Sequence, residues 1–452
     1  MPRCWADRPW QNATAPVCGV LCDYPSALLS LFDAPPLSVV PSRLRSYRMV
    51  AEQEMAQTRS IAIVGAGLGG LAAAIALRQQ GFEVRAYEQA PELAEFGAGI
   101  NISPNSVKLF RAIGLAEKLH AIASEPIGLT WRDWSSDTID NCLPFVDFEK
   151  RYGAKYYVVH RSDLHRLLSE ALPQNIIRLG KRCTQVESQN GSATLIFADG
   201  SSAEADVVVG CDGIRSAVRA SIFGGEGPRY AGTMCWRALA PTHALPKDYH
   251  DRHVNQWSGD DGFIISYYVR QDKFINFVCV RQRPGWSEQS WSVPSSVDEM
   301  LAAFPHVNEK LRRMMASATS CSKWGQFTGE HAPQWTRGRV TLLGDSAHAM
   351  LATFGQGANM AFEDAYVLSR WLRAKTDDPV AALVGYEAVR KPRATKVQQL
   401  SRTEVRFKKQ RSNWDRLRRQ WTFITRHGLT TGGVYRWIFS YDPVSQWQGQ
   451  SA

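Results

Sequence analysis

The sequence predicts a mixed α/β fold, α+β overall: a Rossmann-like dinucleotide-binding domain interleaved with a mostly antiparallel β-sheet domain and followed by C-terminal helices. Three observations predict it. A strand, glycine turn, helix and second strand follow one another over 61–88, and two further buried strands end in loops near 205–213 and 339–345. Residues 226–320 are rich in strand-like runs with many aromatics. The 452 residues suffice for two intertwined domains.

The clearest motif follows the apolar strand 61–64. Gly65, Gly67 and Gly70 occupy the first, third and sixth positions of the turn. Gly65 is expected to permit the tight turn, Gly67 to let backbone approach a pyrophosphate, and Gly70 to let helix and strand pack closely. The helix N-terminus then offers free N–H groups to phosphate. Glu88 ends the second strand, where its carboxylate can accept hydrogen bonds from an adenosine ribose.

Further ligand-facing positions are expected where other strands begin or end. Ala98 and Gly99 lie in a glycine-containing crossing where backbone must approach something flat or phosphorylated. Arg161 stands between a short strand and a helix, where it can meet an anionic ligand, although a plain surface Arg is the alternative. Asp212 and Asp345 follow buried strands, so their loops should lie at the carboxyl edge of the sheet, where ligands bind in such folds.

Together these stretches resemble the single-component FAD-dependent aromatic hydroxylases, the p-hydroxybenzoate hydroxylase-like family, and most of all its salicylate hydroxylase group. The resemblance covers residues 59 to about 375. It rests on the glycine turn with Glu88, on Asp212-Gly213 with Ser216 and Arg219, and on Gly344-Asp345 with Gln356-Gly357 and Glu363-Asp364.

The resemblance implies roles for these positions. Glu88 would bind the adenosine ribose, Arg161 would lie along FAD, Asp345 would hold ribityl or ribose hydroxyls, and Gly357 and Ala358 would lie against the isoalloxazine. Asp212, with Gly213 and Arg219, would serve FAD and pyridine nucleotide together, which agrees with the lack of a second GxGxxG for NAD(P)H. A helix starting near Gly357 would direct its positive end at the ring edge where reduced flavin is negative.

The implied function is an FAD-dependent monooxygenase that uses NAD(P)H and dioxygen to hydroxylate a small aromatic, a phenol or aromatic carboxylate, through a flavin hydroperoxide. The chain has Leu351-Ala352-Thr353 where the family usually has Pro beside flavin and substrate. This departure leaves open flavin-dependent epoxidation or hydroxylation of a non-phenolic natural product. A further alternative is a flavin-binding protein without catalysis, which acts through its basic segment 402–427 on a membrane or partner.

Arg237 and Tyr268 are the predicted catalytic residues. Arg237 and either Tyr267 or Tyr268 stand where the family places groups that face the substrate. An Arg there could hold a carboxylate or a phenolate. Because a strand alternates its faces, an outward Arg237 with core tyrosines is an equal alternative, in which Trp236 or Tyr268 would line the site.

We expect the domains to be interleaved. The predicted boundaries are an N-terminal extension over 1–58, FAD-binding segments over 59–126, 156–225 and 321–375, substrate-domain segments over 127–155 and 226–320, and a C-terminal helical segment over 376–452. The extension is rich in Pro and Trp and lacks periodicity, so it is either a disordered tail, an organelle address or the product of a start codon placed too early.

Composition bears on partners and compartment. The formal net charge is +10, and 402–427 carries nine Lys and Arg against two acidic residues. Nothing there resembles a nucleic-acid fold, so a solvated helix face is expected and no nucleic-acid partner. The longest apolar run, 61–77, is already explained by the strand, turn and helix, so no transmembrane segment is expected. The predicted assembly is a monomer or homodimer.

Cysteines and reactive motifs exclude other chemistries. The nine cysteines form no CxxC and no Cys/His cluster at metal spacing, which predicts reduced thiols in a cytoplasm and no metal. The sequence has no GxSxG, no HExxH and no Ser-His-Asp order, so hydrolase and metalloenzyme activities are not indicated. His348 has no Ser, Cys or carboxylate paired with it at a recognisable spacing, which disfavours it as an acid or base.

Overall fold

The computed structural model describes residues 59–93, 98–189, 191–224, 227–245, 249, 251–286, 293–329, 332–403 and 433–448. The expectations for the extension 1–58 and for most of the basic segment 402–427 fall outside these residues. In the described part of the chain, no helix combines the length and the apolar character needed to cross a membrane.

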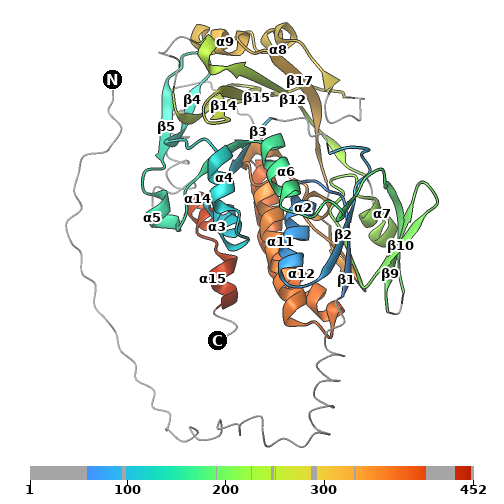
Figure 1. Cartoon of the computed structure of the whole chain (residues 1–452). Helices are drawn as coiled ribbons and strands as arrows, with labels where there is room; N and C mark the ends of the chain where they lie inside the picture. The colour runs from blue at the N-terminus through green and yellow to red at the C-terminus, as the bar shows by residue number, and fades with distance from the viewer. Residues whose placement is uncertain are drawn as a thin grey trace, which may run out of the picture. The chain divides into compact units, whose positions relative to one another are not determined.

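A six-stranded sheet forms the Rossmann-like half of the molecule (Figure 1). The central strand β1 pairs in parallel with β2 on one side and β11 on the other. The strand order is β18 (Thr336–Arg337), β19 (Val340–Leu342), β11 (Val207–Gly210), β1 (Ser60–Val64), β2 (Glu83–Tyr87) and β7 (Ile177–Arg178). Only the edge pair β18–β19 is antiparallel. The predicted strand, turn, helix and strand are therefore present.

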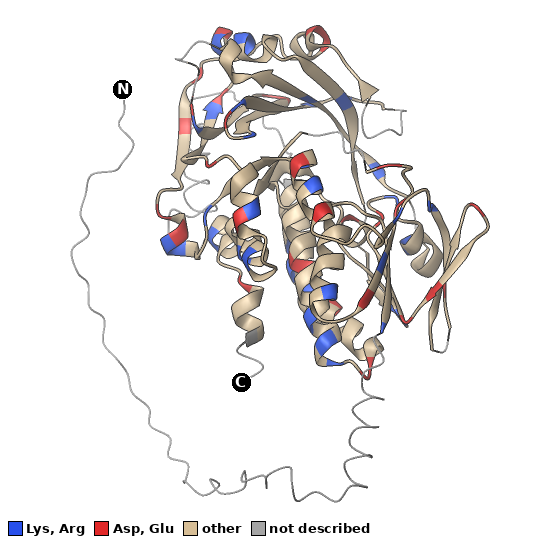
Figure 2. Cartoon of the chain, in the orientation of Figure 1, with Lys and Arg blue, Asp and Glu red and all other residues tan. Residues whose placement is uncertain are grey.

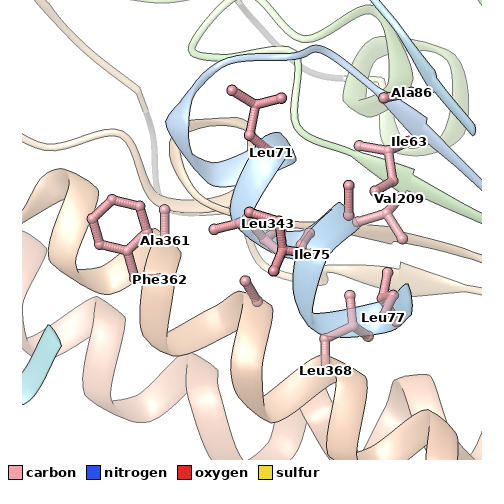
Figure 3. Close-up of a cluster of buried hydrophobic side chains, with 14 of the residues drawn as sticks. Ile63, Leu71, Ile75, Leu77, Ala86, Val209, Leu343, Ala361, Phe362 and Leu368 are labelled. Carbon is pink, nitrogen blue, oxygen red and sulfur yellow. The ribbon is translucent and has the colours of Figure 1, made fainter. Parts of the chain in front are cut away.

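Helix α2 (Leu68–Gln79) packs on this sheet, and α11 (Gly357–Ala374) packs on α2. Figure 3 shows side chains of α2 between the sheet and α11. Helix α2 is short of polar residues because both of its sides are buried. Gly69 lets the two helices approach, since a Cβ at this position would lie 3.1 Å from the Cβ of Ala361. Each large apolar side chain in such a core contributes about 1.5–3 kcal/mol.

A second, eight-stranded sheet lies beside the Rossmann-like half of the molecule (Figure 1). Its order is β16 (Val293–Pro294), β17 (Ser320–Thr328), β12 (Arg229–Pro241), β15 (Phe274–Gln282), β14 (Gly262–Val269), β13 (His253–Ser258), β4 (Gly128–Asp133) and β5 (Ile139–Pro144). All neighbouring pairs are antiparallel except β13 with β4. Strands β4 and β5 come from the part of the chain before the third Rossmann strand, so the interleaved, mostly antiparallel arrangement is confirmed.

Smaller elements complete the described structure. They are β3 (Gly99–Ile102) paired with β6 (Tyr157–His160), the sheet of β8 (Cys183–Ser188), β9 (Ala193–Phe197) and β10 (Ser202–Ala205), and helices α3 (Pro104–Ala112), α4 (Ala116–Ile122), α5 (Phe148–Tyr152), α6 (Arg161–Glu170), α7 (Ala217–Phe223), α8 (Val297–Ala303), α9 (Glu309–Ala316), α10 (Asp345–His348), α12 (Pro379–Thr403), α14 (Val434–Phe439) and α15 (Pro443–Gln448). The domain boundaries stay a prediction. Strand β17 of the eight-stranded sheet runs to Thr328, past residue 320, where the substrate domain was expected to end.

Candidate active site

The three motif glycines have separate structural reasons. Gly65 has φ +100°, and a Cβ on it would lie 2.5 Å from the carbonyl oxygen of Cys211. A Cβ on Gly70 would lie 2.0 Å from the carbonyl oxygen of Gly65, so helix and turn could not pack with any other residue there. A Cβ on Gly67 would meet no atom within 4 Å. The turn is thus tightly packed at its two ends and open at Gly67, as a pyrophosphate requires.

Glu88 lies next to this turn. Its carboxylate accepts hydrogen bonds from the backbone N–H of Ala66 at 2.8 Å and of Ala90 at 3.0 Å. The side chain therefore bridges the end of β2 and the glycine turn. A carboxylate oxygen has more than one lone pair, so these bonds leave room for a ribose hydroxyl.

The crossing that contains Ala98 and Gly99 joins the two halves of the molecule. The N–H of Arg161 donates to the carbonyl of Ala98 at 2.8 Å, and the N–H of Gly99 donates to Oδ1 of Asn276 on β15 at 2.7 Å. A Cβ on Gly99 would lie 2.3 Å from the ring of Tyr267. Glycine is required here because backbone passes directly under a tyrosine of the second sheet.

The loop before α11 is fixed to the same crossing. Side-chain amides of Asn101 and Asn359 both donate to the carbonyl of Gly355, at 3.0 and 2.9 Å. Gly357 then begins α11, with the half-buried Ala358 next to it. The N-terminus of an 18-residue helix thus lies close to Asn101 and Ser103, which follow the Ala98–Gly99 backbone in the chain.

Asp345 and Gly357 lie close together. A Cβ on Gly357 would be 3.9 Å from Oδ1 of Asp345, which is the first residue of α10. The Asp345 side chain is exposed to solvent, yet burial raises its pKa, against the opposing positive charges of His348 and Arg161. A carboxylate that is surrounded by protein but open to solvent on one side suits a hydroxyl-bearing ligand.

Arg219 connects the two loops at the sheet edge. Its guanidinium donates to the carbonyl of Ser346 at 3.0 Å and of Ile214 at 2.6 Å. Asp212 accepts the N–H of Val218 at 3.1 Å through Oδ2, whereas its buried Oδ1 has no hydrogen-bond partner among the described residues. Burial raises the pKa of Asp212, and hydrogen bonds from Ser216 and nearby backbone oppose the rise. The structure therefore brings Asp212 close to the Asp345 loop through Arg219.

Arg237 lies on the sheet face that looks toward the Rossmann-like half. Its neighbours on that face include Cys235, Phe263 and Val278, whereas Trp236 packs against α8 and α9 on the other face. The centre of the guanidinium lies 4.5 Å from the ring of Trp324. Burial lowers the pKa of Arg237, and the positive charge of Arg161 adds to this effect.

No carboxylate of the described residues ion-pairs with Arg237, whose polar contact is with the thiol of Cys235. Its Nε is buried without a hydrogen-bond partner among these residues. The positive charge of Arg161 acts to lower the pKa of both Arg237 and Asp345. Arg161 is therefore near enough to interact with the Arg237 face of the sheet and with the Asp345 loop.

The placement of Tyr268 corrects a prediction. Tyr268 packs with Trp236 in the core under α8 and α9, on the face opposite to Arg237, and therefore cannot line a site with it. Tyr267 lies on the Arg237 face and packs against Val158 of β6. The reason is the strict alternation of side chains along β14.

The sequence did not predict a network of buried charged side chains. His348 Nε2 lies 2.6 Å from Oδ2 of Asp364, and Arg390 Nε donates to Oδ1 of Asp364 at 2.7 Å. Arg390 also lies 2.7 Å from Glu363, which binds Arg393 at 2.8 Å. Arg390 and Arg393 belong to the basic helix α12 (Figure 2). The sequence spacing did not reveal that a carboxylate, Asp364, pairs with His348, and both side chains are fully buried.

This network holds the turn that carries Asp345. Oδ2 of Asp364 also accepts the N–H of Gly344 at 3.1 Å. Oε1 of Glu363 accepts from the side-chain amide of Asn105 at 2.7 Å. Although burial opposes ionisation, the His348 and Arg390 charges keep the pKa of Asp364 below its ordinary value. The network therefore connects α12, α11 and α3 beneath the Asp345 turn.

The chemistry of these positions fits FAD. The open glycine turn at the N-terminus of α2 suits the pyrophosphate. The unpaired Oδ1 of Asp212 and the exposed carboxylate of Asp345 suit ligand hydroxyls. The N-terminus of α11 suits the edge of the flavin ring.

The comparisons give the class of protein. Residues 58–401 match a family model described as FAD binding domain, so the chain belongs to this family of FAD-binding proteins. Its relatives and the site make it an FAD-dependent monooxygenase of the aromatic hydroxylases, and the resemblance to the salicylate hydroxylase group is confirmed. FAD is its cofactor, and NAD(P)H is the typical co-substrate of such enzymes.

Individual relatives are similar over most of their length. The chain is 39% identical to a 3-amino-4-hydroxybenzoate 2-monooxygenase of Streptomyces platensis, over 76% of this chain and 86% of the relative. It is 39% identical to the 6-hydroxynicotinate 3-monooxygenase of Pseudomonas fluorescens, over 77% and 91%. A solved salicylate hydroxylase substrate complex matches with a TM-score of 0.73 at 26% identity, over 86% of this chain and 97% of that one.

Proposed function

We propose that this enzyme hydroxylates a small aromatic ring that carries a carboxylate or reacts as a phenolate, and that Arg237 binds the anionic group. The observation that supports this most is the unpaired Arg237 on the sheet face toward the FAD-binding half. Burying a cation is unfavourable unless an anion compensates it. An anionic substrate would supply the missing partner and would gain a planar, two-pronged set of donors.

Trp324 supports this assignment. The Trp324 ring lies 4.5 Å from the guanidinium of Arg237 and restrains the orientation of that group. Arg237 therefore loses less conformational freedom when it binds a carboxylate. The named substrates of several relatives, hydroxybenzoates and hydroxynicotinate, are aromatic carboxylates. The proposal makes Tyr267, in place of Tyr268, the tyrosine nearest to that substrate.

The proposed cofactor contacts keep the positions expected from sequence. Gly65, Gly67 and Gly70 would form the pyrophosphate turn, and Glu88 would accept from the ribose. The remaining proposed contacts are Ala98, Gly99, Arg161, Asp212, Asp345, Gly357 and Ala358. Held by these residues and reduced by NAD(P)H, FAD would supply the dioxygen-activating chemistry that hydroxylation of the ring needs. The protein positions the ring, and the two halves exclude water from between them.

A panel of paired compounds tests the substrate class. Each hydroxybenzoate or hydroxynicotinate is offered beside its carboxamide, which has the same shape and no charge, and non-phenolic aromatics are included. We expect the carboxylates to stimulate NAD(P)H oxidation with formation of hydroxylated product, and the carboxamides to be poor. Equal turnover of acid and amide would exclude the carboxylate as the group that Arg237 binds and leave the phenolate. Preference for non-phenolic compounds would contradict the proposal and favour the natural-product alternative.

Replacing Glu88 with alanine tests the cofactor placement. We expect FAD affinity to fall tenfold or more, because hydrogen bonds to a charged group contribute about 1.5–3 kcal/mol. The measurement is titration of the apoprotein with FAD, followed by flavin fluorescence. Glu83→Ala serves as the control, since Glu83 is exposed on the same strand and forms an ion pair with Arg85. Unchanged affinity in Glu88→Ala would show that the ribose lies elsewhere.

We also propose a cytoplasmic location and a monomer or homodimer. Cys183, Cys211, Cys235, Cys279 and Cys321 are free thiols, which a reducing compartment explains. Gel filtration with light scattering measures the assembly directly.

A further inference from the structure

Two side chains fix the backbone of Ala66 by hydrogen bonds, one to its N–H and one to its carbonyl. The N–H of Ala66 donates to Glu88 at 2.8 Å. The carbonyl of Ala66 lies 2.8 Å from Nε2 of His165, a buried residue of α6. A carbonyl can only accept, so His165 must carry its proton on Nε2 and donate it.

The carbonyl of Ala66 and the N–H of Gly67 belong to one peptide group. In a planar trans peptide these two groups point in opposite directions. A hydrogen bond that fixes the Ala66 carbonyl toward α6 therefore fixes the Gly67 N–H away from it. No described residue accepts this N–H, and a Cβ on Gly67 would have no atom within 4 Å. The Gly67 N–H therefore has a fixed direction and no acceptor among the described residues.

We propose that His165 is a positioning residue for FAD, which orients the Gly67 N–H toward the pyrophosphate. This inference rests on the proposed placement of the pyrophosphate at the glycine turn. His165 stands one turn along α6 from Arg161, so a single helix both supplies a cation and sets the direction of a backbone donor. Histidine suits this position because its Nε2–H can donate to the buried carbonyl of Ala66.

The test compares three variants in apoprotein titrated with FAD. His165→Leu removes the donor, and we expect the dissociation constant to rise about three- to tenfold, which corresponds to one ordinary hydrogen bond. His165→Gln retains an amide N–H at similar reach and should restore most of the affinity. Leu167→Ala on the same helix is the matched control: it should lower the melting temperature of the apoprotein and leave the FAD affinity of the folded protein unchanged.

A double variant separates this inference from the placement of the cofactor. If Glu88 and His165 act on the same turn, the effect of Glu88→Ala with His165→Leu should differ from the sum of the single effects. Normal FAD affinity in His165→Leu, with weakened affinity in Glu88→Ala, would overturn the role of His165 and leave the placement intact. Normal affinity in both would overturn the placement. Equal losses in His165→Leu and His165→Gln would show that the hydrogen bond is not the cause. Should His165→Leu not fold, His165→Asn takes its place in the comparison with His165→Gln. The shorter side chain of Asn cannot bring its amide as close to the Ala66 carbonyl.

Discussion

Arg390→Met is expected to lower the free energy of unfolding by about 3–5 kcal/mol. The guanidinium of Arg390 is fully buried and lies 2.7 Å from both Glu363 and Asp364, which are themselves fully buried. Methionine fills a similar volume but leaves two carboxylates with fewer compensating charges. The loss reflects those stranded charges, because a buried ion pair that is removed as a whole can be replaced with little change.

Denaturant unfolding of the FAD-free protein measures this effect without a contribution from the cofactor. The control is Arg313→Met, since Arg313 forms an ion pair with Glu309 at 2.8 Å on α9 and both side chains are largely exposed. We expect little or no change there, because solvent screens an exposed ion pair. A similarly small change in Arg390→Met would show that His348 and Arg393 alone compensate the two carboxylates.

Much of the Rossmann-like half could be predicted because its motifs encode local geometry. Gly65 stands at a positive φ, and the strand before it is buried on both faces, so residue type and conformation agree at the same position. Most strands of the second sheet also lie in the stretch 226–320 that was expected to be rich in strands, as β14 (Gly262–Val269) does. Strand β17 was missed beyond residue 320 because Ser, Lys, Gly and Gln interrupt its apolar pattern.

The choice between Tyr267 and Tyr268 could not be made from sequence. Their exposed fractions are 7% and 6%, because β14 is covered on both faces. A strand that is buried on both sides lacks the polar and apolar alternation that reveals its orientation. Only the packing of α8 and α9 against one face distinguishes the two residues.

The buried charges were beyond sequence reasoning for another reason. His348 and Asp364 are 16 residues apart, and Arg390 is 26 residues beyond Asp364. Neither separation corresponds to a helical or strand repeat, so the contacts arise only when α10, α11 and α12 pack together. His165 is a similar case, since it contacts a carbonyl 99 residues earlier in the chain. Side chains that act through long-range contacts leave no local signal.

Arg237→Ala is expected to raise the apparent KM for an aromatic carboxylate by one to two orders of magnitude, on the order of 2 kcal/mol. The FAD content should be unchanged, because Arg237 lies on the substrate sheet and none of its described contacts belongs to the glycine turn. Arg237→Lys should recover only part of the loss, since an ammonium cannot reproduce the planar fork that Trp324 restrains. Steady-state NAD(P)H oxidation and product formation, measured together, separate weaker binding from poor coupling.

Two comparisons make the result specific to the substrate anion. Arg283→Ala removes an exposed guanidinium next to the same sheet and should leave KM unchanged. For the carboxamide analogue, the Arg237→Ala variant and the unaltered enzyme should differ little, because the neutral group gains nothing from the cation. If Arg237→Ala instead kept normal KM and normal coupling with every carboxylate, the unpaired guanidinium would not be the anion site. Arg161, whose positive charge acts on Arg237, would then be the next candidate to bind the charged group of the substrate.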